Sequence, residues 1–253
     1  MPSKDKVSII IPYFRSFNFF KQTLGSILKQ SYKNYEIIII YDDKKKNDLH
    51  LLKSLIFKIK KTKLKLIVNS KNIGAGNSRN KGAKVAKGKY LAFIDSDDQW
   101  NKDKLKKQVK FMKQKKINFS HTSYTIINEN GRKLSKRKAK KKLNYTDLLE
   151  SCDIGLSTVI LTKKLFNKYK FSKNKTKEDY SLWLKISKKQ IIYGLDQNLT
   201  KWRKTHNSLS SNIWQKFLDA YDLYSNQEKF NSFNSMVKVI NLSINFLKKN
   251  NQK

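Results

Sequence analysis

The stretch YLAFIDSDD, residues 90–98, places three aspartates directly after a short and fully apolar run. A continuous apolar run of this length is typical of a strand that is buried on both faces of a sheet. Two comparable runs precede it: residues 7–11 (VSIII), which end at Pro12, and residues 36–41 (EIIIIY), which end at Asp42-Asp43. All three segments predict buried strands, the first stopped by its proline, and two of them lead directly into carboxylates.

The segments between these strands alternate with them. Apolar residues at helical spacing predict helices over residues 19–30, 49–59 and 78–87, and a strand over residues 64–68 precedes a glycine-bearing loop over residues 72–77. This alternation predicts an α/β fold with a mainly parallel sheet flanked by helices. Ligands of such sheets bind at the carboxyl ends of the strands, where both acidic clusters lie.

The second half of the chain is less regular. It predicts a basic helix over residues 102–115, strands over 119–128 and 158–161, a lysine-rich loop over 133–142 and a helix over 180–187. Residues 213–249 predict two further helices. One carries an apolar stripe of Trp214, Phe217, Leu218, Tyr221 and Tyr224, and the other carries Met236, Val239, Ile240, Phe246 and Leu247.

The composition is strongly basic, with a formal net charge of +37. Such an excess suggests polyanionic partners: nucleic acid, anionic lipid or a phosphorylated substrate. AT-rich coding explains the same composition without selection, because Lys, Asn and Ile are abundant while the chain has only 8 Gly and 2 Pro. We expect no nucleic-acid partner, since specific base readout relies on Arg with Asn or Gln and the basic residues here are nearly all lysines.

Several features bear on the compartment. The single cysteine, Cys152, excludes an internal disulfide, and the longest apolar run, residues 37–41, has the length of a strand and not of a membrane span. The first predicted strand begins at residue 7, which leaves no room for a signal peptide. We therefore expect a cytoplasmic protein.

The aspartates after the strand that ends at residue 94 indicate a cation site. Asp95 and Asp97, with Asp98 beside them, repel one another and are costly to hold together unless a cation is present. Mg²⁺ or Mn²⁺ suits one or two carboxylates completed by water and substrate phosphates. The alternative is a solvated acidic turn that caps the next helix.

Eight segments follow one another in the order of a known family. They are residues 7–14 (VSIIIPYF), 24–32 (LGSILKQSY), 36–42 (EIIIIYD), 72–88 (NIGAGNSRNKGAKVAKG), 90–98, 157–159 (STV), 178–184 (EDYSLWL) and 202–208 (WRKTHNS). Through them the chain, from about residue 6 to residue 211, resembles the family-2 glycosyltransferases of the GT-A (Rossmann-like) fold. The resemblance implies a catalytic domain over residues 1–211, with a nucleotide-binding half to about residue 100 and an acceptor half from about residue 101. A C-terminal helical extension over residues 212–253 follows.

The resemblance also implies roles for individual residues. It assigns the donor nucleotide to Pro12, Phe14, Asp42, Arg79, Asp95 and Ser96; for Phe14 a place in the core, and for Arg79 a surface ion pair, are the alternatives. It makes Asp97 the direct metal ligand, with His206 near the diphosphate and the metal. Asp179 resembles the general base, and Glu178, Asp98 and Trp183 resemble supporting residues.

One segment departs from the family pattern. The second strand is followed by Asp42-Asp43-Lys44, where the family usually has two aspartates, a glycine and a serine. A register shifted by one residue would give Asp43 the base contact assigned to Asp42. The signature of processive members is absent, so we expect the addition of a single sugar.

The function implied by the resemblance is inverting transfer of one sugar from a nucleotide sugar, UDP-linked by family habit, to a hydroxyl acceptor in cell-surface glycan synthesis. The acceptor would be a glycan or a lipid-linked molecule. Nucleotidyl transfer is an alternative, disfavoured by Glu178-Asp179. The charge and the stripe over residues 213–224 also predict peripheral association with an anionic membrane at its inner face, although the stripe has packing onto the catalytic domain as the favoured alternative.

Overall fold

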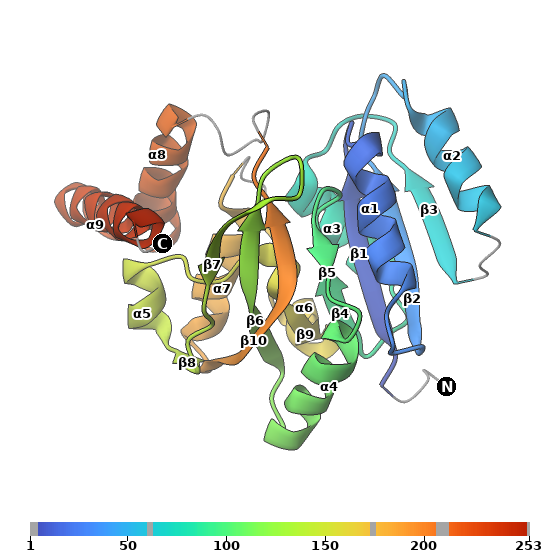
Figure 1. Cartoon of the computed structure of the whole chain (residues 1–253). Coiled ribbons are helices and arrows are strands. Elements are labelled where there is room, and N and C mark those ends of the chain that lie inside the picture. The colour runs from blue at the N-terminus through green and yellow to red at the C-terminus, as the bar shows by residue number, and fades with distance from the viewer. Residues whose placement is uncertain (1–4, 60–62, 173–175, 206–212, 252–253) are drawn as a thin grey trace.

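The computed structural model describes residues 5–59, 63–172, 176–205 and 213–251 (Figure 1). Within them, ten strands form one sheet in the order β3-β2-β1-β4-β9-β6-β10-β5, with β7 paired to β6 and β8 to β10. The strands are β1 (Val7–Tyr13), β2 (Tyr35–Tyr41), β3 (Leu64–Val68), β4 (Tyr90–Phe93), β5 (Gln99–Trp100), β6 (Phe119–Ile127), β7 (Lys133–Arg137), β8 (Lys142–Leu143), β9 (Ile160–Thr162) and β10 (Ile192–Arg203).

The helices lie on both faces of this sheet. They are α1 (Phe17–Leu28), α2 (Leu49–Lys58), α3 (Ala75–Val85), α4 (Lys104–Lys115), α5 (Tyr145–Glu150), α6 (Lys163–Lys168), α7 (Glu178–Ser187), α8 (Ile213–Asp222) and α9 (Ser232–Asn251). Leu156–Thr158 form a 3₁₀ turn between α5 and β9, and Leu223–Gln227 form a π-helical turn after α8.

The predicted α/β fold with a mainly parallel sheet is confirmed. Strands β3, β2, β1 and β4 run parallel to one another, as do β6 and β10, while β9 between β4 and β6 runs the other way. Because parallel strands end at the same edge, the residues that follow β1, β2 and β4 lie side by side there. The backbone N–H of Asp42 accordingly donates to the carbonyl of Tyr13 (2.9 Å).

The alternation of side chains along each strand builds two cores, one on each face of the sheet. In β1, Ile9 and Ile11 pack with residues of α1, α2 and α4, whereas Ile10 packs on the other face with residues of α3 and α5 to α9. Successive side chains of a strand point to opposite faces, so an apolar run buries both faces at once.

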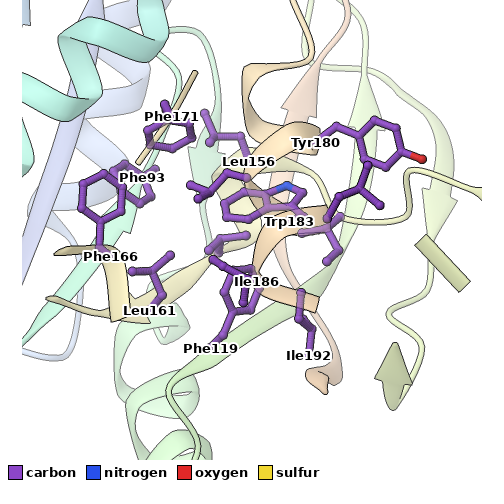
Figure 2. Close-up of a cluster of buried hydrophobic side chains, with 14 of the residues drawn as sticks. Phe93, Phe119, Leu156, Leu161, Phe166, Phe171, Tyr180, Trp183, Ile186 and Ile192 are labelled. Carbon is purple, nitrogen blue, oxygen red and sulfur yellow. The ribbon is translucent and has the colours of Figure 1, made fainter. Parts of the chain in front are cut away.

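Trp183 lies at the centre of the second core (Figure 2). Its fully buried ring meets Phe119 edge to face, with centroids 4.9 Å apart, and Phe171 at 6.2 Å. The structure thus gives Trp183 a packing role: it anchors α7, the helix that begins with Glu178 and Asp179, against the sheet.

Two expectations about local structure were wrong. Pro12 does not stop β1, which continues to Tyr13 with Pro12 opposite Ile40; beyond Ile10 the strand pairs with β2 only, so the missing N–H of Pro12 lies at a local edge. The lysine-rich segment 133–142 is not all loop, because β7 pairs antiparallel with β6 and β8 begins at Lys142. Lysines on an edge strand are a known defence against unwanted strand pairing.

The predicted C-terminal helices are present as α8 and α9, which lie beyond the β6–β10 side of the sheet (Figure 1). Of the predicted stripe over residues 214–224, Tyr224 in the π-turn is fully buried and Phe217 and Tyr221 of α8 pack against the core, whereas Trp214 and Leu218 are 79% and 59% exposed. Packing onto the rest of the protein is therefore the main role of this stripe. No helix among the described residues is long and apolar enough to cross a bilayer.

Candidate functional site

The loop after β4 holds the predicted acidic cluster. Asp95 and Asp97 are partly exposed, and Asp98 is fully buried. The backbone N–H of Asp95 donates to the hydroxyl of Ser157 (3.0 Å), and the hydroxyl of Thr23 donates to the carbonyl of Ser96 (3.0 Å). These bonds from α1 and from the turn before β9 fix the loop at the carboxyl edge of the sheet.

Arg203, the last residue of β10, holds the loop from the other side. Its Nε donates to the carbonyl of Asp97 (2.9 Å), its backbone N–H donates to Oδ1 of Asp98 (2.8 Å), and one guanidinium N–H donates to Gln22 of α1 (2.8 Å). Two further bonds reach carbonyl oxygens in the turn after β6 (3.1 and 2.7 Å). The side chain also lies over the ring of Phe19 at 4.7 Å. The planar guanidinium of Arg203 thus connects β10, α1 and the turn after β6 to the backbone of Asp97.

The carboxyl groups of the loop are held close together in a poorly solvated place. Burial, and then the charge of Asp95, raises the pKa of Asp97 to about 7. Burial also raises the pKa of Asp98 well above its ordinary value, with Asp97 and Asp95 adding to the effect. Oδ2 of Asp98 is buried without a hydrogen-bond partner among the described residues. Both effects show that negative charge is under-compensated here.

A divalent cation fits this donor set. Mg²⁺ and Mn²⁺ take oxygen ligands and need only one or two carboxylates when substrate phosphates and water complete the shell. Asp97 offers such a carboxylate, whereas no group of three or more His, Cys, Asp or Glu side chains suited to a metal is found among the described residues. His206, the second predicted ligand, lies outside the described residues.

Arg79 connects this loop to α7. From α3, one guanidinium nitrogen donates to Oδ1 of Asp95 (2.7 Å) and another donates to Oε1 of Glu178 (2.6 Å), while Phe171 packs on its face at 5.4 Å. Burial alone would lower the pKa of Arg79, but the charges of Asp95 and Glu178 raise it. The alternative of an ion pair is thus borne out, but Arg79 is buried, so the pair does not lie at the surface.

The close approach of α3 and α7 depends on a glycine. A Cβ atom at Gly76 would lie 3.0 Å from Cγ of Glu178 and 3.0 Å from the carbonyl oxygen of Ser172. Both distances are tighter than ordinary contacts, so α7 or the segment at Ser172 would have to shift by a few tenths of an ångström to admit a larger residue.

Asp179 stands beside Glu178 in the first turn of α7 and differs from it in environment. Burial and then the charge of Glu178 raise the pKa of Asp179 to about 7, although Arg79 and the N–H of Tyr180 (2.7 Å) lower it. A carboxyl group with such a pKa can accept a proton near neutral pH.

The backbone before α7 is fixed by its neighbours. Lys177 has a positive φ of 57°, and Thr176 donates from its N–H to Asp219 of α8 (3.1 Å).

On the β2 side of the site, Asp42 and Asp43 have different partners. Oδ1 of Asp42 accepts from Asn69 (2.8 Å) and from the N–H of Ile73 (2.9 Å). Both oxygens of Asp43 accept hydrogen bonds from Arg15 (2.6 and 3.1 Å), and these bonds lower the pKa of Asp43. A bidentate pair of this kind leaves Asp43 little capacity for a ligand, which favours Asp42 for the base contact.

The remaining predicted residues of this region are Phe14, Ser96 and Pro12. Phe14 is 47% exposed, with Arg15 packed on its ring at 4.7 Å, so its alternative place in the core is wrong. Ser96 accepts a hydrogen bond from the hydroxyl of Ser16 (2.6 Å), and Pro12 is buried within β1.

The structure therefore joins the predicted residues into two groups. One consists of Arg79, Asp95, Glu178 and Asp179, and the other of Asp97 and Asp98 around Arg203. Sequence reasoning did not assign roles to Arg203 or Ser157. A usable signal existed for Arg203: it is one of the few arginines in a chain whose basic residues are nearly all lysines.

Comparisons with known proteins agree with this geometry. Residues 8–174 match the family described as "Glycosyl transferase family 2". The "Putative teichuronic acid biosynthesis glycosyltransferase TuaG" of Bacillus subtilis (strain 168) is 31% identical over 248 residues, which are 97% of this chain and 98% of that protein. The "UDP-Glc:alpha-D-GlcNAc-diphosphoundecaprenol beta-1,3-glucosyltransferase WfgD" of Escherichia coli is 34% identical over 86% of this chain and 84% of its own length.

A solved structure shares the fold. Residues 1–349 of S. aureus TarS in complex with UDP-GlcNAc superpose with a TM-score of 0.72 at 20% identity, covering 93% of this chain and 71% of that one. The family match favours sugar transfer over the nucleic-acid-binding and nucleotidyl-transfer alternatives.

Proposed function

The chain belongs to glycosyl transferase family 2, and from this premise we propose that it transfers a single sugar from a UDP-linked donor to a hydroxyl acceptor, with inversion, in cell-surface glycan synthesis. The observation that carries the proposal is the link made by Arg79. It joins Asp95, in the loop that would face the donor, to Glu178 beside a carboxyl group whose pKa is near neutral. The buried guanidinium of Arg79 is thus bonded both to the loop proposed to face the sugar donor and to the residue beside the proposed base.

The proposed step is a single displacement at the anomeric carbon. Asp179 accepts the proton of the acceptor hydroxyl while that oxygen forms a bond to the anomeric carbon. The bond from this carbon to the donor phosphate oxygen breaks, and its electron pair leaves with the nucleoside diphosphate. Attack from the face opposite the leaving group inverts the configuration, so no covalent enzyme intermediate is needed.

We propose Mg²⁺ or Mn²⁺ as the cofactor, held by Asp97 and, outside the described residues, by His206. The cation would supply positive charge to the departing diphosphate. Arg203 contributes by fixing the carbonyl of Asp97 and, through its N–H, the carboxyl group of Asp98. The raised pKa of Asp97 supports this proposal, because carboxylates that repel each other gain most from a bound cation.

We further propose a lipid-linked acceptor at the inner, anionic face of the membrane. WfgD and WfaP of Escherichia coli, named as glucosyltransferases that act on a diphosphoundecaprenol-linked sugar, support this class of acceptor at 34% and 36% identity. The charge of +37 suits a diphosphate-bearing acceptor at a negatively charged surface.

The direct test is donor binding followed by transfer. Nucleotide sugars are screened by thermal shift with Mn²⁺, and the best donor is then assayed for release of its nucleoside diphosphate in the presence of a diphosphate-lipid acceptor. We expect a UDP-sugar to stabilise the protein and turnover to require the acceptor. Asp179→Asn should bind the donor but lose turnover, whereas the control Asp103→Asn, at the start of α4 and outside the site, should keep both. The proposal fails if no nucleotide sugar binds with or without Mn²⁺.

A further inference from the structure

Helix α9 has apolar residues on two opposite sides. Val239 and Leu242 are buried against the core, at 1% and 8% exposure. A second stripe recurs at intervals of four and three residues and consists of Phe233 (77% exposed), Val237 (39%), Ile240 (47%), Ile244 (42%) and Leu247 (61%). With 3.6 residues per turn, these five share one side of the helix, roughly opposite Val239 and Leu242. We call them the outward stripe.

The outward stripe is not a random scatter of exposed side chains. Nine of the fourteen exposed large apolar residues among the described positions lie on α8 and α9, which form one end of the molecule (Figure 1). Single exposed apolar residues are normal on protein surfaces, but a contiguous set marks a surface that another apolar phase covers.

The charge around the outward stripe indicates which kind of partner covers this apolar surface. From Lys229 to Lys253 the sequence contains five lysines and no acidic residue. Lys238 is paired with Glu150, whereas Lys229 and Lys248 are exposed. An apolar helical face accompanied by lysines is typical of helices that lie in the interface of an anionic bilayer. A second copy of the chain fits less well, because each copy carries a charge of +37 and no acidic side chain of this segment could pair with those lysines.

We propose that the outward stripe of α9 lies in the headgroup region of a bilayer that contains anionic phospholipid, with the exposed Lys229 and Lys248 at the phosphate level. This surface is distinct from the α8 stripe predicted from sequence, which is mostly packed inside. The inference deepens the proposed function, because membrane binding would bring the enzyme to the proposed lipid-linked acceptor. The observations that support it are the exposed apolar residues and the lysines, which do not depend on that acceptor.

The same C-terminal unit is bonded to the helix of the proposed base. Asp219 of α8 accepts from the N–H and the hydroxyl of Thr176, just before α7. In the following π-turn, the hydroxyl of Tyr224 lies 3.0 Å from that of Tyr180, and Gln227 accepts from Ser181 (2.6 Å). These bonds connect α8 and the π-turn to α7, and α9 follows the π-turn directly in the chain.

The test is binding of the full chain to vesicles, without donor, acceptor or metal. Vesicles of phosphatidylcholine alone are compared with an equal mixture of phosphatidylcholine and phosphatidylglycerol. We expect binding to the mixture only, weakening steeply with salt. The double variant Phe233→Ser/Leu247→Ser should lower affinity about tenfold or more, because each side chain loses most of its apolar transfer energy. Phe57→Ser is the matched control, since Phe57 is 81% exposed but lies on α2, across the sheet.

A second pair of variants separates charge from apolar contact. Lys229→Gln and Lys248→Gln, both exposed, should each weaken binding to the anionic vesicles roughly fivefold. Equal binding to both kinds of vesicle, or stripe variants that bind like wild type, would overturn the proposal. So would a concentration-dependent dimer that Phe233→Ser abolishes while vesicle binding stays intact, because a second copy would then cover the stripe.

Failure of this proposal is distinguishable from failure of the proposed function. The stripe variants should transfer sugar to a water-soluble acceptor at the wild-type rate, since no residue of the outward stripe contacts the site. Vesicle binding without any transfer would leave the surface proposal standing and remove the enzymatic one.

Discussion

Asp179 and Glu178 are adjacent carboxyl groups. The structure predicts that replacing each by its amide changes the stability of the protein in opposite directions. The pKa of Asp179 is about 7 in the folded protein against an ordinary value of 3.8. This difference corresponds to about 4 kcal/mol if fully expressed, and water at this partly exposed side chain reduces it to about 1–2 kcal/mol. Because the folded state holds the proton more tightly than the unfolded chain, the group lowers stability as the pH rises from about 4 to about 7. Asp179→Asn should therefore stabilise the protein at neutral pH.

Glu178→Gln should do the reverse. Glu178 is buried and accepts a 2.6 Å bond from Arg79, so the change leaves a buried guanidinium with one charged partner where it had two. Losing the charge of such a bond costs about 1.5–3 kcal/mol. In a domain of this size each kcal/mol moves the melting temperature by about 2–4 °C, so the two variants should melt on opposite sides of wild type.

Calorimetry at about pH 5 and about pH 8, together with transfer rates, checks both signs. The gain from Asp179→Asn should be largest at the higher pH and smaller at the lower, where the folded wild-type group is protonated but the unfolded one is already ionised; it should vanish only below about pH 4. Transfer should fall about a hundredfold to ten-thousandfold in Asp179→Asn, while donor affinity stays within a few-fold. In wild type the rate should rise with pH through about 7 and then level off. An Asp179→Asn protein that melts lower at both pH values and transfers normally would refute the reasoning, and loss of transfer in Glu178→Gln alone would move the base to Glu178.

Three further predictions concern Asp97, Arg203 and Lys104. Donor affinity measured by calorimetry should collapse with chelator or with Asp97→Ala; equal affinity in both conditions would exclude the metal. Arg203→Lys should destabilise the protein by about 2 kcal/mol and weaken donor binding, because a single ammonium cannot reproduce the fork that holds the carbonyl of Asp97; unchanged melting and affinity would contradict this. Lys104 is fully buried, and burial lowers its pKa well below the ordinary value, so the folded state binds its proton less tightly than the unfolded chain. Lys104→Met should thus raise the melting temperature, and more at lower pH; a uniform loss of stability would show that its bond to Gln108 (2.8 Å) matters more.

The first half of the fold is readable from the sequence because local pattern and global position agree there. The apolar runs of β1, β2 and β4 are buried on both faces, and their carboxylates follow at the shared edge. β10 gave no such signal: its sequence, IYGLDQNLTKWR, mixes exposed polar residues with buried ones, and its pairing with β6 shifts register twice near Asn198. A strand whose neighbours change along its length has no single period to detect.

Contacts within the site were likewise not predictable from the sequence. The sequence indicated that Asp95, Arg79 and Glu178 belong to one site, but not that Arg79 is already bonded to both carboxylates, since Glu178 lies 99 residues away. Arginine usage carries information that the motifs did not. The basic residues of this chain are nearly all lysines. Arg15, Arg79 and Arg203 each lie where the guanidinium group donates two or more hydrogen bonds.

Arg79 also explains why neighbouring carboxyl groups on one helix differ in chemistry. The single buried guanidinium is bonded to Glu178 and Asp95, whereas Asp179 accepts from the N–H of Tyr180. Burial, and then the charge of Glu178, raises the pKa of Asp179 to about 7, although the charge of Arg79 lowers it. One group is thereby held by an ion pair and the next is left with a pKa near neutral. Because the same guanidinium is bonded to Asp95, any ligand that draws Asp95 or Arg79 toward itself changes the field at Asp179. A donor bound beside Asp95, as proposed, would therefore act on the proposed base through the charge of Arg79.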